Sequence, residues 1–240
     1  MQKVARGVQA EVSRFLQGER VSASWVTFGD LDAAFQSASE FANVPTIYLV
    51  LPTRSKWSVL WNNSFLCDGY DSLCYNLTKN HGLRTLHWSA HDHWTSFQSG
   101  ALFVHRQRNG GELVERSVYV VQEDKRWSFG AVGDPLPEED LHSYEARRKQ
   151  DRLNEQRLAS FLARLGAQPW LEQFYALPEI QVFVLRREAP PTTITRRSVD
   201  DVLRLGQPLV SADAGIAPQF QIGRPCPGAA DPGPNRSVSP

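Results

Sequence analysis

The chain has 240 residues, of which 41% are hydrophobic and 10% aromatic, and its 26 basic and 26 acidic residues cancel. This composition is typical of a globular protein with an apolar core, and the length allows one domain or one and a half. The zero net charge creates no field that would attract nucleic acid or an anionic membrane, so both are disfavoured as partners. The longest apolar run, from Ile47 to Leu51, is far too short to span a bilayer.

Two amphipathic helices are expected in the first 45 residues. Apolar side chains recur at helical spacing over 3–17, and Gly18 ends this pattern. Asp30 is a candidate N-cap for a second helix that reaches Asn43, where Pro45 prevents its continuation.

Two strands and a third helix follow in the predicted order. Residues 46–51 are rich in β-branched and aromatic side chains, which predicts a buried strand, and 56–61 predicts the next one. A helix is then expected to begin near Asp68 and to end close to Gly82.

From residue 83 onward the hydrophobic period changes to two, which indicates β structure. Four strands are predicted in this region, at 83–90, 95–106, 113–122 and 126–131. A long charged helix is then expected over 138–165, because Glu138, Glu139 and Asp140 form the acidic first turn that a helix dipole favours. Residues 179–186 predict a final strand.

These elements predict an α+β fold, in which a mainly antiparallel sheet is packed against several helices, with a disordered C-terminal tail. A single domain is expected over 1–188, with one sheet built from 46–131 and 179–186. Residues 189–206 are expected to form a linker with room for a short helix. Residues 207–240 hold seven prolines and show no periodicity, so they are predicted to be disordered.

Three cysteines, Cys67, Cys74 and Cys226, make an odd number, so a disulfide framework is not expected. Reduced thiols are the prediction, and they indicate a reducing compartment. The N-terminus lacks the apolar run of a signal peptide. A soluble cytoplasmic protein is therefore expected.

Histidine and tryptophan are concentrated in the centre of the chain. Five of the six histidines lie between His81 and His105, and five of the seven tryptophans lie between Trp57 and Trp127. Such a concentration of imidazole and indole rings is typical either of a site or of a hydrogen-bonded aromatic core.

His87, His91 and His93 are the candidate metal ligands. On an extended strand they share one face, because successive side chains alternate. Imidazoles arranged in this way bind Zn²⁺ when a further ligand arrives from elsewhere. The alternative is a solvated polar face of a sheet.

The same run is similar to the HxHxDH motif of metallo-β-lactamase-type hydrolases. However, Trp88 and Ala90 occupy the positions of the first two histidines of that motif. The chain is therefore not assigned to that family.

Five aromatic residues are the candidate binding residues: Trp57, Trp61, Tyr70, Trp88 and Trp94. Large rings of this kind either build a core or, when exposed, form a patch that binds a partner. The core is the expected place for most of them.

The central stretch as a whole, with Trp57 to Trp61, then Cys67 to Cys74, a hairpin-rich sheet and a charged helix, resembles small bacterial α+β proteins that serve as immunity or accessory factors. No motif names a family. The leading expectation is a non-enzymatic binding protein without a cofactor, whose partner is another protein and whose aromatic sheet surface makes the contact. The alternative is a metal-dependent hydrolase that uses a zinc ion on the strand 83–93. A nucleic-acid-binding regulator is a weaker third class, and the oligomeric state stays open.

Removal of residues 207–240 tests the predicted tail. Because this segment has no apolar period, its deletion is expected to change the melting temperature by less than about 2 °C, which corresponds to at most about 1 kcal/mol for a chain of this size. Differential scanning calorimetry of the full chain and of a chain ending at Gly206 measures the effect. A drop of many degrees would show that the segment packs on the domain.

Overall fold

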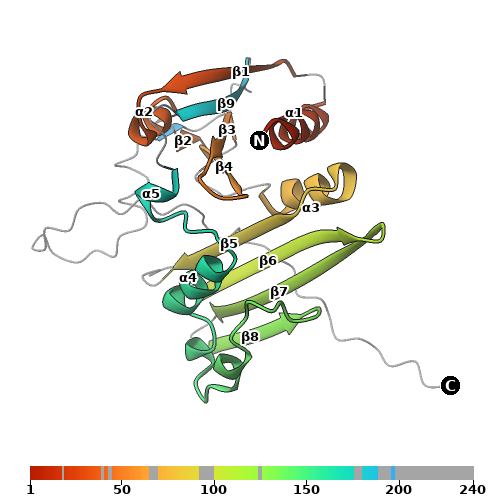
Figure 1. The fold of residues 1–240 in the computed structure, drawn as a ribbon, viewed down its shortest axis with the longest axis vertical. Helices are drawn as coiled ribbons and strands as arrows, with labels where there is room; N and C mark the ends of the chain where they lie inside the picture. The colour runs from red at the N-terminus through yellow and green to blue at the C-terminus, as the bar shows by residue number, and fades with distance from the viewer. Residues whose placement is uncertain are drawn as a thin grey trace, which may run out of the picture.

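The computed structural model of this chain describes most of its first 188 residues and one short segment beyond them. The described ranges are 1–17, 19–38, 41–42, 45–64, 70–91, 100–123, 126–175, 180–188 and 196–197. Two antiparallel sheets of four strands each are packed with several helices, which confirms the α+β class (Figure 1). The expected single sheet is wrong, because the strands divide into two sheets.

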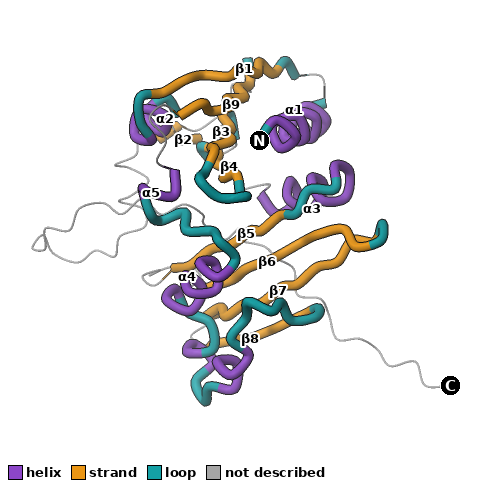
Figure 2. Tube along the Cα trace, viewed as in Figure 1, coloured by secondary structure: helices purple, strands orange, loops and turns teal. Residues whose placement is uncertain are grey.

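Helices and strands both occur throughout the described part of the chain (Figure 2). The helices are α1 (Gln2–Phe15), α2 (Leu31–Gln36), α3 (Tyr70–His81), α4 (Glu155–Arg164) and α5 (Glu172–Tyr175), with 3₁₀ helices at Leu141–Glu145 and Lys149–Asp151. The strands are β1 (Val21–Phe28), β2 (Phe41–Ala42), β3 (Ile47–Pro52), β4 (Ser58–Asn62), β5 (Thr85–His91), β6 (Gly100–Asn109), β7 (Glu112–Glu123), β8 (Arg126–Val132), β9 (Ile180–Arg187) and β10 (Arg196–Arg197).

The first sheet has the strand order β1-β9-β3-β4, and all neighbouring strands in it are antiparallel. β9 comes from more than 100 residues later in the chain and lies between β1 and β3. Helices α2 and α5 pack on one face of this sheet, and α1 and α3 pack on the other. Because the two central strands are buried on both faces, 47–51 and 182–185 are continuous apolar runs rather than alternating ones.

The second sheet is a meander with the order β5-β6-β7-β8. Helix α4 covers one face, where the ring of Phe103 stacks on that of Phe161 with 4.2 Å between centroids. Helix α3 packs near the edge of the opposite face, where the hydroxyls of Thr78 and Thr85 are 2.9 Å apart. α3 therefore contacts both sheets.

Several predicted elements are confirmed with small shifts of their ends: the helix 3–17, the strands 46–51 and 56–61, and the β region from residue 83. The strand β1 was not predicted. It is an edge strand whose serine-rich sequence is partly exposed on both faces, so its apolar period is weak.

The predicted helix over 30–43 is shorter than expected. Asp30 does cap it, since its Oδ1 accepts a hydrogen bond of 2.7 Å from the backbone N–H of Ala33. The helix ends at Gln36, and Phe41 and Ala42 instead form β2, which pairs with β10. β10 falls inside the segment predicted to be a linker.

The predicted helix over 138–165 is wrong in its first half. Only α4 is α-helical, and Asn154 caps it by accepting a hydrogen bond of 3.0 Å from the backbone N–H of Arg157. Glu139 does not serve in a helical first turn. Its carboxylate is fully buried and binds Arg116 of β7, so a tertiary ion pair replaces the helix dipole as its partner.

Other predictions fall outside the described residues. The tail 207–240 is among them, as are most of the linker 189–206 and the start of the predicted strand 95–106. None of the described helices is long and apolar enough to cross a membrane.

The ion pair of Arg116 and Glu139 is saturated with hydrogen bonds. Arg116 donates from Nη2 to Glu139 Oε2 (2.6 Å) and from Nε to Oε1 (2.9 Å). The hydroxyl of Tyr144 and the backbone N–H of Leu136 donate to the same carboxylate at 2.9 and 2.7 Å. The pair thereby fixes the irregular segment before α4 onto the second sheet.

Substitution of Glu139 by Ala is expected to lower the free energy of unfolding by about 3–5 kcal/mol, because it leaves the buried guanidinium of Arg116 without a counter-charge. Urea denaturation measures the change. Glu145→Ala is the matched control, since this carboxylate is exposed and its loss is expected to cost less than about 0.5 kcal/mol. Equal effects of the two substitutions would contradict the prediction.

Candidate functional site

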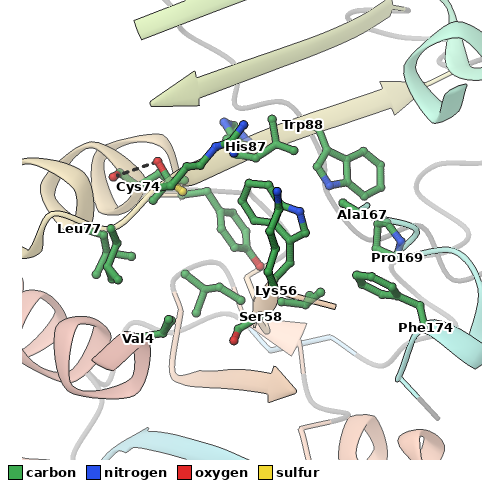
Figure 3. Close-up of a pocket in the computed structure, with 18 residues that line it drawn as sticks. Val4, Lys56, Ser58, Cys74, Leu77, His87, Trp88, Ala167, Pro169 and Phe174 are labelled. Atoms are coloured by element: carbon green, nitrogen blue, oxygen red, sulfur yellow. Dashed lines mark hydrogen bonds between the residues drawn. The ribbon is translucent and has the colours of Figure 1, made fainter. Parts of the chain in front are cut away.

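A cavity of about 360 Å³ lies between the two sheets (Figure 3). Its walls include residues from both faces of β4 and of β5, which are edge strands of their sheets. Figure 3 shows His87 and Trp88 on the β5 side, Cys74 and Leu77 on α3, and the segment from Ala167 to Phe174 on the opposite wall. The cavity is therefore the space between two sheet edges, closed by helices on one side and by the chain after α4 on the other.

The outer edge of β4 presents backbone polar groups to this space. The backbone N–H of Asn63 donates to the carbonyl of Ile47 on β3 (3.2 Å). In an antiparallel pair, every second residue bonds to the neighbouring strand, and the backbone groups of the residues between them point the other way. The N–H of Asn62 points the other way and donates to the Tyr70 hydroxyl (2.6 Å). By the same alternation, the backbone groups of Ser58 and Leu60 point away from β3, on the side of β4 that borders the cavity.

Three of the five predicted binding aromatics line the cavity: Trp57, Tyr70 and Trp88. Trp61 does not. Its ring meets Phe35 edge-on, with 5.5 Å between centroids, in the core of the first sheet. Trp94 lies outside the described residues. The aromatic residues thus gather in the walls of a cavity rather than on an open sheet surface.

Trp57 is fixed by two further contacts. Its indole Nε1 donates to the carbonyl of Leu165 at the end of α4 (2.9 Å). The guanidinium of Arg84 lies 5.4 Å from the ring centroid, within the range of a cation–π interaction. Both contacts hold the ring in place without filling the cavity.

Trp170 is a residue that the sequence analysis missed. Its ring meets that of Trp88 edge-on at 6.5 Å, and 44% of the residue is exposed. It follows Pro169, which lines the cavity, so it lies near the rim. The only sequence signal for it is an aromatic residue next to proline in a non-periodic segment.

Arg84 was also missed, as was its contact with His105. Arg84 Nε donates to Nε2 of His105 (2.6 Å), and the imidazole is buried at 2% exposure. Burial, and then the nearby charge of Arg84, lower the pKa of His105 to about 4, against an opposing effect of Glu139. The imidazole is therefore neutral near pH 7, as an acceptor at Nε2 must be.

His87 is the one predicted metal ligand whose side chain is described. Its ring stacks on Tyr70 at 6.3 Å, and its Nδ1 lies 3.6 Å from Asp71 Oδ1, too far for a hydrogen bond. Nδ1 is buried and has no hydrogen-bond partner among the described residues. The interaction with His87, and then hydrogen bonds from Arg106, hold the pKa of Asp71 well below its usual range although burial opposes them.

The proposed zinc site stays a prediction. The side chains of His91 and His93 lie outside what the structure describes, so their convergence on His87 is not tested. Within the described residues, no group of three or more His, Cys, Asp or Glu side chains could hold a metal ion.

Cys74 lies in the cavity wall as a free thiol. Burial raises the pKa of Cys74 to about 12, with a smaller opposing effect of Arg106. The thiol is therefore protonated near pH 7 and is a weak nucleophile. The Thr85 hydroxyl donates to the backbone carbonyl of Cys74 at 3.4 Å, which ties β5 to α3 (Figure 3).

Comparisons of this chain with protein families, with curated proteins and with solved structures find no match. The cavity has aromatic walls, two sheet edges and three side chains with an ionisable nitrogen, those of Lys56, Arg84 and His87.

The lowered pKa of His105 predicts a loss of stability in mild acid. A histidine whose pKa is lower in the folded than in the unfolded state stabilises the fold fully above the unfolded value of about 6.5, and this contribution is lost as pH falls toward about 4. As the pH falls from about 7 to about 5, the low pKa of His105 in the folded state is expected to lower the free energy of unfolding by about 2 kcal/mol. Denaturant titrations at the two pH values measure it.

His105→Gln is the variant for this test, because its amide oxygen can still accept from Arg84 but does not titrate. Between the same two pH values, the free energy of unfolding of the variant is expected to fall by about 2 kcal/mol less than that of the wild type. His142→Gln is the control for the substitution itself, since the side chain of His142 is almost fully exposed and its replacement removes no buried contact. An identical slope for His105→Gln and the wild type would refute the assignment.

Proposed function

We propose that this protein is a binding protein, and that its ligand is a small molecule with an apolar, aromatic-sized body that occupies the cavity between β4 and β5. The observation that carries the proposal is the cavity itself, which has a volume of about 360 Å³ and walls that include Trp57, Trp88 and Phe174. Ligand sites for small molecules are concave, mostly apolar and roughly 300–1,000 Å³ in volume. An apolar body in this space would replace water against aromatic rings that are already held in place.

The polar groups of the wall favour binding over catalysis. Nucleophilic catalysis requires a nucleophile within hydrogen-bond reach of a base. Cys74 is protonated, and among the described residues no hydrogen bond joins Cys74 or Ser58 to an imidazole. The Tyr70 hydroxyl already accepts from the backbone of Asn62. These groups support orientation of a ligand more than its conversion.

The expectations of a protein partner, an immunity-like role and a cytoplasmic location remain predictions from the sequence. The zinc-dependent hydrolase remains the alternative, and elemental analysis separates it from the binding protein. About one zinc ion per purified chain would favour the hydrolase.

The cavity is tested with N-phenyl-1-naphthylamine, an uncharged dye whose emission rises in apolar surroundings. Titration of the wild type is expected to give saturable binding. Trp88→Leu is expected to weaken it about tenfold, because it removes part of an aromatic wall. Fluorescence of the dye gives both dissociation constants, and circular dichroism checks that the variant is folded.

Trp25→Leu is the matched control, because Trp25 lies on β1, is 39% exposed and does not line the cavity. It is expected to bind the dye as the wild type does. No saturable binding by the wild type, or equal weakening by both substitutions, would contradict the proposed function.

A further inference from the structure

We infer that the ligand is an organic monocarboxylate, whose carboxylate is held at the cavity by Arg84 and Lys56 while its apolar body lies among the aromatic rings. This inference rests on the proposed function and adds the charge and the functional group of the ligand.

The ionisable groups of the cavity wall differ from those of the whole chain. The chain has equal numbers of acidic and basic residues. The described wall contains Lys56, Arg84 and His87 but no aspartate or glutamate. A wall with cationic side chains and no carboxylate favours an anion over a neutral or cationic ligand.

Arg84 differs from three arginines whose side chains are buried in ion pairs. Arg106, Arg116 and Arg187 each pair with at least one carboxylate of the chain. For Arg84, no ion pair joins its guanidinium to a carboxylate of the described residues, and its Nη1 and Nη2 make no hydrogen bond there. The two terminal nitrogens are the donors that bind a carboxylate in parallel.

The orientation of Arg84 is set by uncharged groups. Nε is held by the neutral imidazole of His105 at 2.6 Å, and the guanidinium lies over the ring of Trp57 at 5.4 Å. Neither contact cancels the positive charge. The side chain is therefore positioned before the ligand arrives, which lowers the entropic cost of binding an anion.

Lys56 supplies a second positive charge from the other side. It precedes Trp57 in the segment that leads into β4, whereas Arg84 directly precedes β5. No carboxylate of the described residues forms an ion pair with Lys56. Two cations on opposite sheet edges, next to an apolar space, match a ligand with one anionic end and an apolar body.

Three ligands of nearly equal shape test the inference: 1-naphthaleneacetate, its neutral amide 1-naphthaleneacetamide, and the cation 2-(1-naphthyl)ethylammonium. Calorimetric titration of the wild-type full chain is expected to show the carboxylate binding at least about tenfold more tightly than the amide, and the cation binding weakest. The advantage of the carboxylate is expected to shrink at high salt, because screening weakens exposed ion pairs.

Arg84→Met is expected to abolish the preference for the carboxylate while the amide still binds. Arg126→Met is the matched control, because this substitution removes the same charge. Arg126 is exposed on β8 and does not line the cavity. This control is expected to keep the preference. Lys56→Met is the second variant, expected to reduce the preference about threefold or more, and it keeps the test valid if Arg84→Met does not fold.

The outcomes separate the inference from the function on which it rests. If the amide binds as tightly as the carboxylate, the inference is overturned and the proposed binding function stands. If none of the three ligands, nor the neutral dye, binds the wild type, both fail. If Arg84→Met retains the full preference, the assignment of Arg84 is overturned.

Discussion

Trp57 lies where the two sheets meet, and its indole packs against the cores of both. The hydrogen bond from its Nε1 to Leu165 ties the segment before β4 to the end of α4, across more than 100 residues of chain. Among the described strands no backbone pairing joins the two sheets, because β4 and β5 are each at the edge of a sheet. Side-chain contacts such as those of Trp57 must therefore set the separation of the two edges. This separation leaves room for the cavity, so the site depends on the contacts that Trp57 makes with both sheets.

The sequence predicts the elements of this fold better than their arrangement. The period of apolar side chains reveals the β region after residue 83 and the helix α1, because both signals are local. The division into two sheets depends on β9 entering between β1 and β3, and no local pattern reports which strands pair. The helix expected over 138–165 failed for a similar reason. A carboxylate at position 139 fits a helical first turn equally well as a buried partner of Arg116, and only the tertiary structure distinguishes the two.

The candidate site shows the same limit. The density of aromatic residues directs attention to Trp57, Tyr70 and Trp88, which do come together around one space. Arg84 becomes notable only through the register of β5 and β6, which places Leu86 opposite His105 and so brings this imidazole next to Arg84. Periodicity gives the face on which a residue lies, but it does not give the partner across the sheet. A polar pair built from two strands is therefore not visible in one sequence.

Two arginines in and beside the second sheet, Arg116 and Arg84, have partners of different charge. Arg116 is buried with Glu139, and the attraction and hydrogen bonds within the pair offset the cost of removing both charges from water. Arg84 is exposed and donates a hydrogen bond to a neutral imidazole, so its positive charge is not neutralised by its partner. A carboxylate in place of His105 would orient the guanidinium equally well but would cancel the charge. Because burial keeps this imidazole neutral, the structure gains an oriented cation beside an apolar space, at the expense of stability in acid. Under the proposed function, this arrangement leaves the charge of Arg84 available to an anionic ligand beside the cavity.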